Sequence, residues 1–104
     1  MTRDMELETK VYVKESLIHG NGLFVHEIIR SDEIIGHVKG TRTDVDGPYV
    51  LWIDDNNGIE VSCHLRFINH SDIPNACYYD SLEVIAIKDI EKDEEITHDY
   101  SIGI

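Results

Sequence analysis

Residues 66–75 read Arg-Phe-Ile-Asn-His-Ser-Asp-Ile-Pro-Asn, and residues 94–100 read Glu-Glu-Ile-Thr-His-Asp-Tyr. Both segments are polar and rich in turn-forming residues. Residues 65–68 have the length of a single helical turn, and residues 96–98 have the length of a short strand. Pattern alone therefore identifies two polar, turn-rich segments in a chain of short apolar runs.

Short stretches with aromatic and β-branched residues surround these segments, which is the pattern of β-strands. Asn57-Gly58 is the strongest hairpin signal, because both positions tolerate a positive φ. Residues 44–48 hold Asp, Gly and Pro and predict a loop. No long helical period occurs, so we predict a mainly β domain with about one turn of helix. The expected strands lie near residues 8–13, 23–25, 33–35, 49–53, 59–62, 82–87 and 96–98.

Length and composition limit the class of protein. A chain of 104 residues predicts a single domain over residues 1–104, and its 41% of hydrophobic residues suits a globular core. Acidic residues outnumber basic ones by 21 to 9, which gives a net charge of −12. This charge argues against direct nucleic-acid binding and favours a cationic partner, such as a lysine-rich protein tail. Solubility alone is the competing explanation.

The sequence shows neither the pattern of a membrane span nor that of a signal peptide. No apolar run approaches the roughly 20 residues that a membrane span needs, and residues 1–8 lack the apolar centre of a signal peptide. We therefore expect a cytoplasmic protein with no membrane association. Cys63 and Cys77 are the only cysteines, and free thiols are the simplest expectation for them in that compartment.

Several motifs have a simple structural explanation. Residues 54–58 suggest a calcium loop, but the alignment puts Ile53 where a carboxylate is needed. The histidines and cysteines lack the close Cys-x-x-Cys spacing of structural zinc, so no metal site is predicted. The acids of residues 89–95 predict a solvated turn. Gly20-Asn21-Gly22, taken alone, predicts a sharp turn.

Three segments taken together are similar to a known family. Residues 19–24, His-Gly-Asn-Gly-Leu-Phe, resemble the Gly-x-Gly segment near the start of SET domains. Residues 66–75 resemble the Arg-Phe-Ile-Asn-His-Ser…Pro-Asn motif, and residues 94–100 resemble the closing Glu-Glu-Leu-Thr-Phe-Asp-Tyr motif. Their order and separation also fit, and the likeness runs from about Val11 to Tyr100. The chain thus resembles the SET-domain protein lysine methyltransferases.

The resemblance implies a fold that pattern cannot predict. SET domains have a mainly β, β-clip fold of small twisted sheets with a C-terminal pseudoknot. In that knot, the closing segment threads through a loop formed by the Asn-His-Ser segment. Such threading departs from the usual rule for chain connections.

The resemblance also implies an activity: S-adenosylmethionine-dependent methylation of a lysine in a basic protein, which is histone-like, ribosomal or of another kind. Asn69 would bind the cofactor, and His70 would hold the adenine edge with its backbone and brace the knot with its ring. Arg66 would hold the knot together. The implied cofactor-binding residues are Gly20, Asn21, Gly22, Asn69 and His70, and the implied catalytic residues are Tyr100, at the methyl-transfer point, and Tyr49, in the lysine channel.

The sequence departs from the family pattern in places. Residues 36–40, Gly-His-Val-Lys-Gly, stand where many relatives have Glu-Tyr-x-Gly-Glu, so a wall of the substrate or cofactor pocket is expected to differ. His98 replaces a phenylalanine that often packs near the channel. No cysteine-rich zinc segment follows Tyr100, so we expect the tail, the substrate or a second copy in a homodimer to close the channel. A non-catalytic SET-like module that recognises a protein tail, and a small-molecule methyltransferase, are the alternatives.

Overall fold

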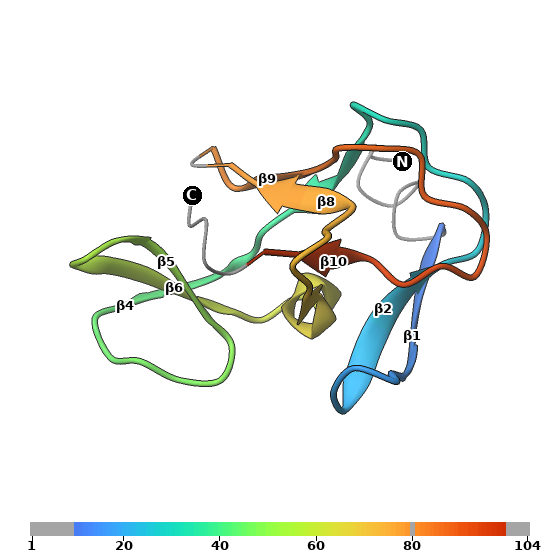
Figure 1. Cartoon of the computed structure of the whole chain (residues 1–104). Coiled ribbons are helices and arrows are strands. Elements are labelled where there is room, and N and C mark those ends of the chain that lie inside the picture. The colour runs from blue at the N-terminus through green and yellow to red at the C-terminus, as the bar shows by residue number, and fades with distance from the viewer. Residues whose placement is uncertain (1–9, 80, 100–104) are drawn as a thin grey trace.

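The computed structural model describes residues 10–79 and 81–99, which form four small sheets (Figure 1). Three sheets are antiparallel, with strand orders β1-β2, β3-β9-β8 and β4-β6-β5, and the fourth is the parallel pair of β7 and β10. In chain order the elements are β1 (Val11–Glu15), β2 (Asn21–Val25), β3 (Ile34–His37), β4 (Gly40–Thr43), β5 (Val50–Asp54), β6 (Asn57–Val61), the 3-10 turn η1 (His64–Phe67), β7 (Asn69–His70), β8 (Ala76–Tyr78), β9 (Glu83–Ala86) and β10 (Thr97–His98).

The hydrophobic core lies where these sheets and the single helical turn meet. Strand β9 alternates, with Val84 and Ala86 buried and their neighbours half-buried, as expected for a strand with one face on a core. Strand β2 is different, because residues 22–25 are buried on both faces. The largest fully buried side chains are Leu23, Ile29, Leu65, Ile68, Ile90, Ile96, Val25 and Val84.

Burial of β2 on both faces follows from the position of the closing segment, which we define as residues 94–98. The amide of Ile96 donates to the carbonyl of Leu23 at 2.8 Å, and the amide of Val25 donates to the carbonyl of Glu94 at 3.2 Å. The closing segment therefore runs antiparallel beside β2, with one isolated bridge between Phe24 and Glu95. In Figure 1 its last part, β10 in dark red, is surrounded by elements from earlier in the chain.

Two further contacts hold the closing segment in place. On β7, Asn69 pairs with Thr97 and His70 with His98, in parallel. From the segment that follows β7, the buried side chain of Asn75 donates to the carbonyl of Glu95 and accepts from the amide of Thr97, both at 2.8 Å. The closing segment thus lies between β7 and Asn75, as the expected pseudoknot requires.

The mainly β prediction is confirmed, and so is the short helical turn before the first polar segment. The hairpin between β5 and β6 is present, but its predicted turn at Asn57-Gly58 is wrong. Asp54 pairs with Asn57, so Asp55 and Asn56 form the turn, and no described residue from 54 to 58 has a positive φ. Hydrogen bonds from the Asn57 side chain and the Asn56 amide to Asp54 stabilise this turn and hold the pKa of the Asp54 carboxyl below its ordinary value.

Strand β4 was not predicted, because Gly40–Thr43 is largely exposed and has no apolar alternation. Backbone pairing with β6 alone makes it a strand. Leu82, which the sequence places in a strand, instead has a φ of 68° in the turn before β9. Within the described ranges, no helix has the length and apolarity to cross a membrane.

We expect Asn75→Ala to destabilise the fold more than any exposed asparagine change. It removes three side-chain hydrogen bonds and leaves the amide of Thr97 and the carbonyl of Glu95 unsatisfied around a buried site, which costs roughly 2–4 kcal/mol. Urea unfolding followed by Trp52 fluorescence measures the loss. Asn56→Ala, in the exposed turn, is the matched control. Equal midpoints for the two variants would contradict the role given to Asn75.

Candidate functional site

The loop between β1 and β2 covers residues 16–20 and is called the Gly20 loop; Asn21 and Gly22 follow it as the first residues of β2. Ser16 closes it, since its amide donates to the carbonyl of Gly20 at 2.7 Å and its Oγ accepts from the amide of Ile18 at 2.9 Å. Gly20 has a φ of +44°, and a side chain there would have no neighbour within 4 Å. Conformation therefore requires glycine at this position, and the residues Gly20 and Asn21 are exposed.

The side chain of Asn69 faces this loop. Its Nδ2 donates to the carbonyls of His19 at 3.0 Å and Asn21 at 3.2 Å, and to Oε2 of Glu95 at 2.9 Å. Four of the five residues predicted to bind a cofactor, Gly20, Asn21, Gly22 and Asn69, thus meet at one place, although 50 residues separate His19 from Asn69 in sequence. Their role in binding stays a prediction.

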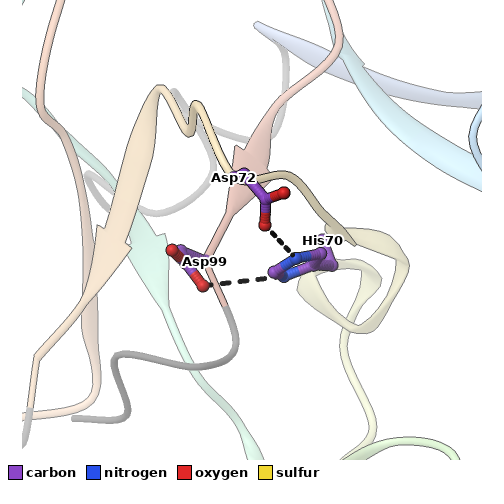
Figure 2. Close-up of side chains that lie close together, drawn as sticks. All are labelled: His70, Asp72 and Asp99. Atoms are coloured by element: carbon purple, nitrogen blue, oxygen red, sulfur yellow. Dashed lines mark hydrogen bonds and ion pairs between the residues drawn. The ribbon is translucent and has the colours of Figure 1, made fainter.

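His70, the fifth of these residues, lies between two carboxylates (Figure 2). Its Nε2 is 3.0 Å from Oδ1 of Asp72, and its Nδ1 is 3.8 Å from Oδ1 of Asp99. Within residues 10–79 and 81–99, His70, Asp72 and Asp99 are the one group of three histidine, cysteine or carboxylate side chains close enough together to consider as metal ligands. Each ring nitrogen faces a different carboxylate, so the ring links the loop after β7 to the end of β10. The side chain of Asp72 is 91% exposed.

A cavity of about 280 Å³ lies on the other side of β10 from the Gly20 loop. Its walls are mostly apolar and aromatic. Tyr49 is 44% exposed at this site, and its ring meets Phe67 edge-on at 6.1 Å. The lining residues are Pro48, Tyr49, Val50, Leu51, Trp52, Val61, Arg66, Ile68, Tyr78 and His98.

His98 forms a buried polar part of the cavity wall. It is 2% exposed, and its ring packs edge-on against Tyr78 with centroids 4.6 Å apart. Burial lowers the pKa of His98. A backbone hydrogen bond with Ala76 and the charge of Asp99 oppose that shift, while the charge of His70 adds to it. The imidazole is therefore neutral near pH 7.

Arg66 has a structural position at the edge of the cavity. Its guanidinium donates to the carbonyls of Ser62 at 2.9 Å and Cys63 at 3.1 Å, and it lies over the Phe67 ring at 4.4 Å. These bonds brace the start of η1, and the implied role of Arg66 in holding the knot together stays a prediction. Cys63 and Cys77 are free thiols, as expected.

The sequence did not identify every residue of the site. Tyr100 lies outside the described residues. Trp52 and Tyr78 reach the cavity from strands and carried no signal beyond that of core aromatics. Glu95 was predicted to lie in a solvated acidic turn, and this is wrong: it is half-buried and hydrogen-bonded to Ser16 and Asn69. Residues 36–40, expected to alter a pocket wall, do not line this cavity; Gly36, His37 and Lys39 line a separate small pocket.

The fold of this chain is similar to that of a solved structure. A crystal structure of a candidate histone methyltransferase from Plasmodium falciparum superposes with a TM-score of 0.70 at 26% identity, covering 88% of this chain and 92% of that one. The architecture is therefore that of a SET domain. A family model described as the SET domain matches residues 20–101, and the chain belongs to that family.

The similar proteins of known activity are histone-lysine methyltransferases. The chain is 31% identical over 111 residues to the histone-lysine N-methyltransferase, H3 lysine-4 specific, of Aspergillus oryzae, covering 82% of the chain and 9% of that protein. It is 32% identical over 119 residues to histone-lysine N-methyltransferase 2B of Homo sapiens, covering 90% of the chain and 4% of that protein. Lysine methylation is thus supported at the level of the family. The chain spans less than a tenth of the length of these two relatives.

The buried imidazole of His98 predicts a dependence of stability on pH. Its folded-state pKa is lowered from the ordinary 6.5, so the unfolded state binds more protons just below that value. The stability it contributes is present above about pH 6.5 and is lost as the pH falls towards the folded-state pKa. Urea midpoints at about pH 7.5 and pH 5.5 should therefore differ less in His98→Phe than in the unmodified protein.

The control for this experiment is His19→Gln, which removes an exposed histidine. Its pH dependence should match that of the unmodified protein. If His98→Phe keeps the full dependence, another group is responsible for it.

Proposed function

We propose that this chain uses S-adenosylmethionine to methylate the side chain of a lysine in a basic protein. The observation that supports this proposal is that the Gly20 loop and the apolar cavity are both reached by side chains of the β7–β10 pair. Successive side chains of a strand point to opposite faces, so Asn69 with Thr97 and His70 with His98 occupy opposite faces of the β7–β10 pair. Asn69 reaches the Gly20 loop, and His98 reaches the cavity.

The cofactor side of this arrangement has suitable groups. Gly20 and Asn21 are exposed, so their backbone groups and the carbonyl of His19 could contact an ammonium group, and the amide of Asn69 would add a polar contact. The rest of the cofactor would contact the backbone of His70. When bound, S-adenosylmethionine supplies a methyl group on a positively charged sulfonium.

The cavity suits the aliphatic stem of a lysine and discourages its charged form. A free lysine amine has a pKa near 10.4, so reaching the neutral form near pH 7.4 costs about 4 kcal/mol. An apolar, aromatic wall disfavours the ammonium and lowers its pKa. The hydroxyls of Tyr49 and Tyr100 would orient the amine, so that alignment supplies much of the rate. No strong protein base is required.

The charge of the protein supports a basic substrate. The net charge of −12 attracts cationic chains. One acid lies beside the cavity, since Asp46 accepts a hydrogen bond from the indole of Trp52 at 3.1 Å. The two relatives named histone-lysine N-methyltransferases have histones, which are basic proteins, as substrates in their names. A cytoplasmic location, a single domain over residues 1–104, a homodimer and the absence of direct nucleic-acid binding stay predictions.

Tyr100→Phe tests the catalytic part of the proposal. We expect methyl transfer to a proteome extract, followed with a radiolabelled cofactor, to fall at least tenfold, because the hydroxyl that orients the amine is lost. Cofactor affinity, measured by calorimetry, should stay within about twofold, because the aromatic ring remains.

Tyr79→Phe is the matched control, since it removes an exposed tyrosine hydroxyl, and it should leave transfer unchanged. Unchanged transfer in Tyr100→Phe would remove Tyr100 from the mechanism. No calorimetric signal with the unmodified protein would instead favour the non-catalytic protein-binding module.

The choice of a basic protein as substrate has its own test. The Michaelis constant for a lysine- and arginine-rich peptide should rise several-fold between about 50 mM and 300 mM salt, because screening weakens attraction to the acidic surface. A peptide with the same central lysine and glutamine in place of the flanking basic residues is the control. A Michaelis constant that does not change with salt would exclude electrostatic attraction and leave small-molecule methylation as the better explanation.

A further inference from the structure

Glu95 connects the closing segment to the loop between β1 and β2. It lies two residues before the start of β10, and its backbone forms an isolated bridge with Phe24. Its half-buried carboxylate accepts hydrogen bonds from the Ser16 hydroxyl, at 2.8 Å and 3.0 Å to its two oxygens. Oε2 also accepts from Nδ2 of Asn69 at 2.9 Å. One side chain thus joins three separate parts of the chain.

The packing at Gly22 shows that this position is tightly defined. Gly22 is buried in β2, and a Cβ placed there would lie 2.8 Å from the carboxyl carbon of Glu95 and closer still to Oε2. Its φ is not positive, so conformation does not explain the glycine. Glycine at position 22 provides the space in which the Glu95 carboxylate lies.

Glu95 influences the Gly20 loop through Ser16. The same Ser16 oxygen that bonds Glu95 accepts from the amides of Ile18 at 2.9 Å and His19 at 3.4 Å. The carbonyl of His19 in turn accepts from Asn69. Loss of Glu95 would therefore release Ser16 and, with it, the stretch of backbone whose carbonyls face the Asn69 amide.

Glu95 also fixes the Asn69 amide directly. The carbonyls of His19 and Asn21 and the Glu95 carboxylate are all acceptors, and all three face Nδ2. An amide has donors only on its nitrogen, so this arrangement sets which end of the group points away from the loop. Asn69 Oδ1 is therefore directed away from these three oxygens, where it can accept a hydrogen bond.

From these contacts we propose that Glu95 is a positioning residue for the ammonium end of the cofactor. It acts through the Ser16 loop and the Asn69 amide rather than by pairing its charge with the ligand. The inference rests on the proposed function, since it concerns the same cofactor. It identifies a residue of the acidic run as part of the cofactor site.

The test compares Glu95→Ala with Glu95→Gln by calorimetry with S-adenosylmethionine. We expect Glu95→Ala to weaken binding at least about tenfold, because the hydrogen bonds to a charged group are no longer aligned. Glu95→Gln should stay within about threefold, because glutamine keeps an oxygen for Asn69 and an amide that can bond Ser16 Oγ. Glu60→Ala, an exposed carboxylate on β6, controls for net charge and should bind as the unmodified protein does.

A second ligand separates positioning from general damage to the fold. Methylthioadenosine lacks the amino-acid end of the cofactor, so Glu95→Ala should bind it about as well as the unmodified protein does. Thermal unfolding without ligand measures any loss of stability directly. An equal loss for both ligands would show a general structural role and overturn the inference.

The other outcomes are also decisive. If Glu95→Gln binds S-adenosylmethionine as weakly as Glu95→Ala, the charge itself contacts the ligand and positioning is wrong. If Glu95→Ala binds as Glu60→Ala does, Glu95 has no role in the site. If the unmodified protein binds neither ligand, the proposed function fails and the inference fails with it. Normal binding by the unmodified protein with no effect at Glu95 rejects the inference alone.

Discussion

Asn75 donates a hydrogen bond to the carbonyl of Glu95 and accepts one from the amide of Thr97, and both halves of the site depend on this pair of contacts. Together with the β7 ladder, they fix the closing segment along its length. A shift of one residue in that segment would exchange the side chains on its two faces. Asn69 would then lose its place beside Glu95, and His98 would leave the cavity. Buried amide groups can impose such a register because an unsatisfied partner is costly.

The same constraint explains how a small chain holds two adjacent sites. Few residues separate the Gly20 loop from the cavity, because the β7–β10 ladder has only two rungs. One face provides polar contacts at Asn69, and the other provides an apolar, aromatic wall. The methyl donor and the acceptor amine of the proposed reaction would need this contrast, since a charged group and a neutral amine require different surroundings.

His98 and Glu95 show that buried polar residues of the closing segment have distinct tasks. Burial lowers the pKa of His98, so it lines the cavity without adding a positive charge there near pH 7. Glu95 keeps its partners Ser16 and Asn69 and lies over Gly22. The two residues are separated by Ile96 and Thr97, and they face different parts of the molecule.

The sequence alone determined the mainly β class, because short apolar runs and turn residues are local signals. Its motifs, taken with the family resemblance, predicted that Asn69, His70 and the Gly20 loop form one site, and the structure brings Asn69 to that loop. Pairing across the chain could not be predicted locally. Strand β4 has no apolar pattern and exists because β6 pairs with it, and the β5–β6 turn lies at Asp55-Asn56 because Asp54 is bonded to its neighbours. The burial of Glu95 could not be predicted either, because an acidic run is typical of a solvated turn. Space for the Glu95 carboxylate comes from Gly22, which is distant in sequence.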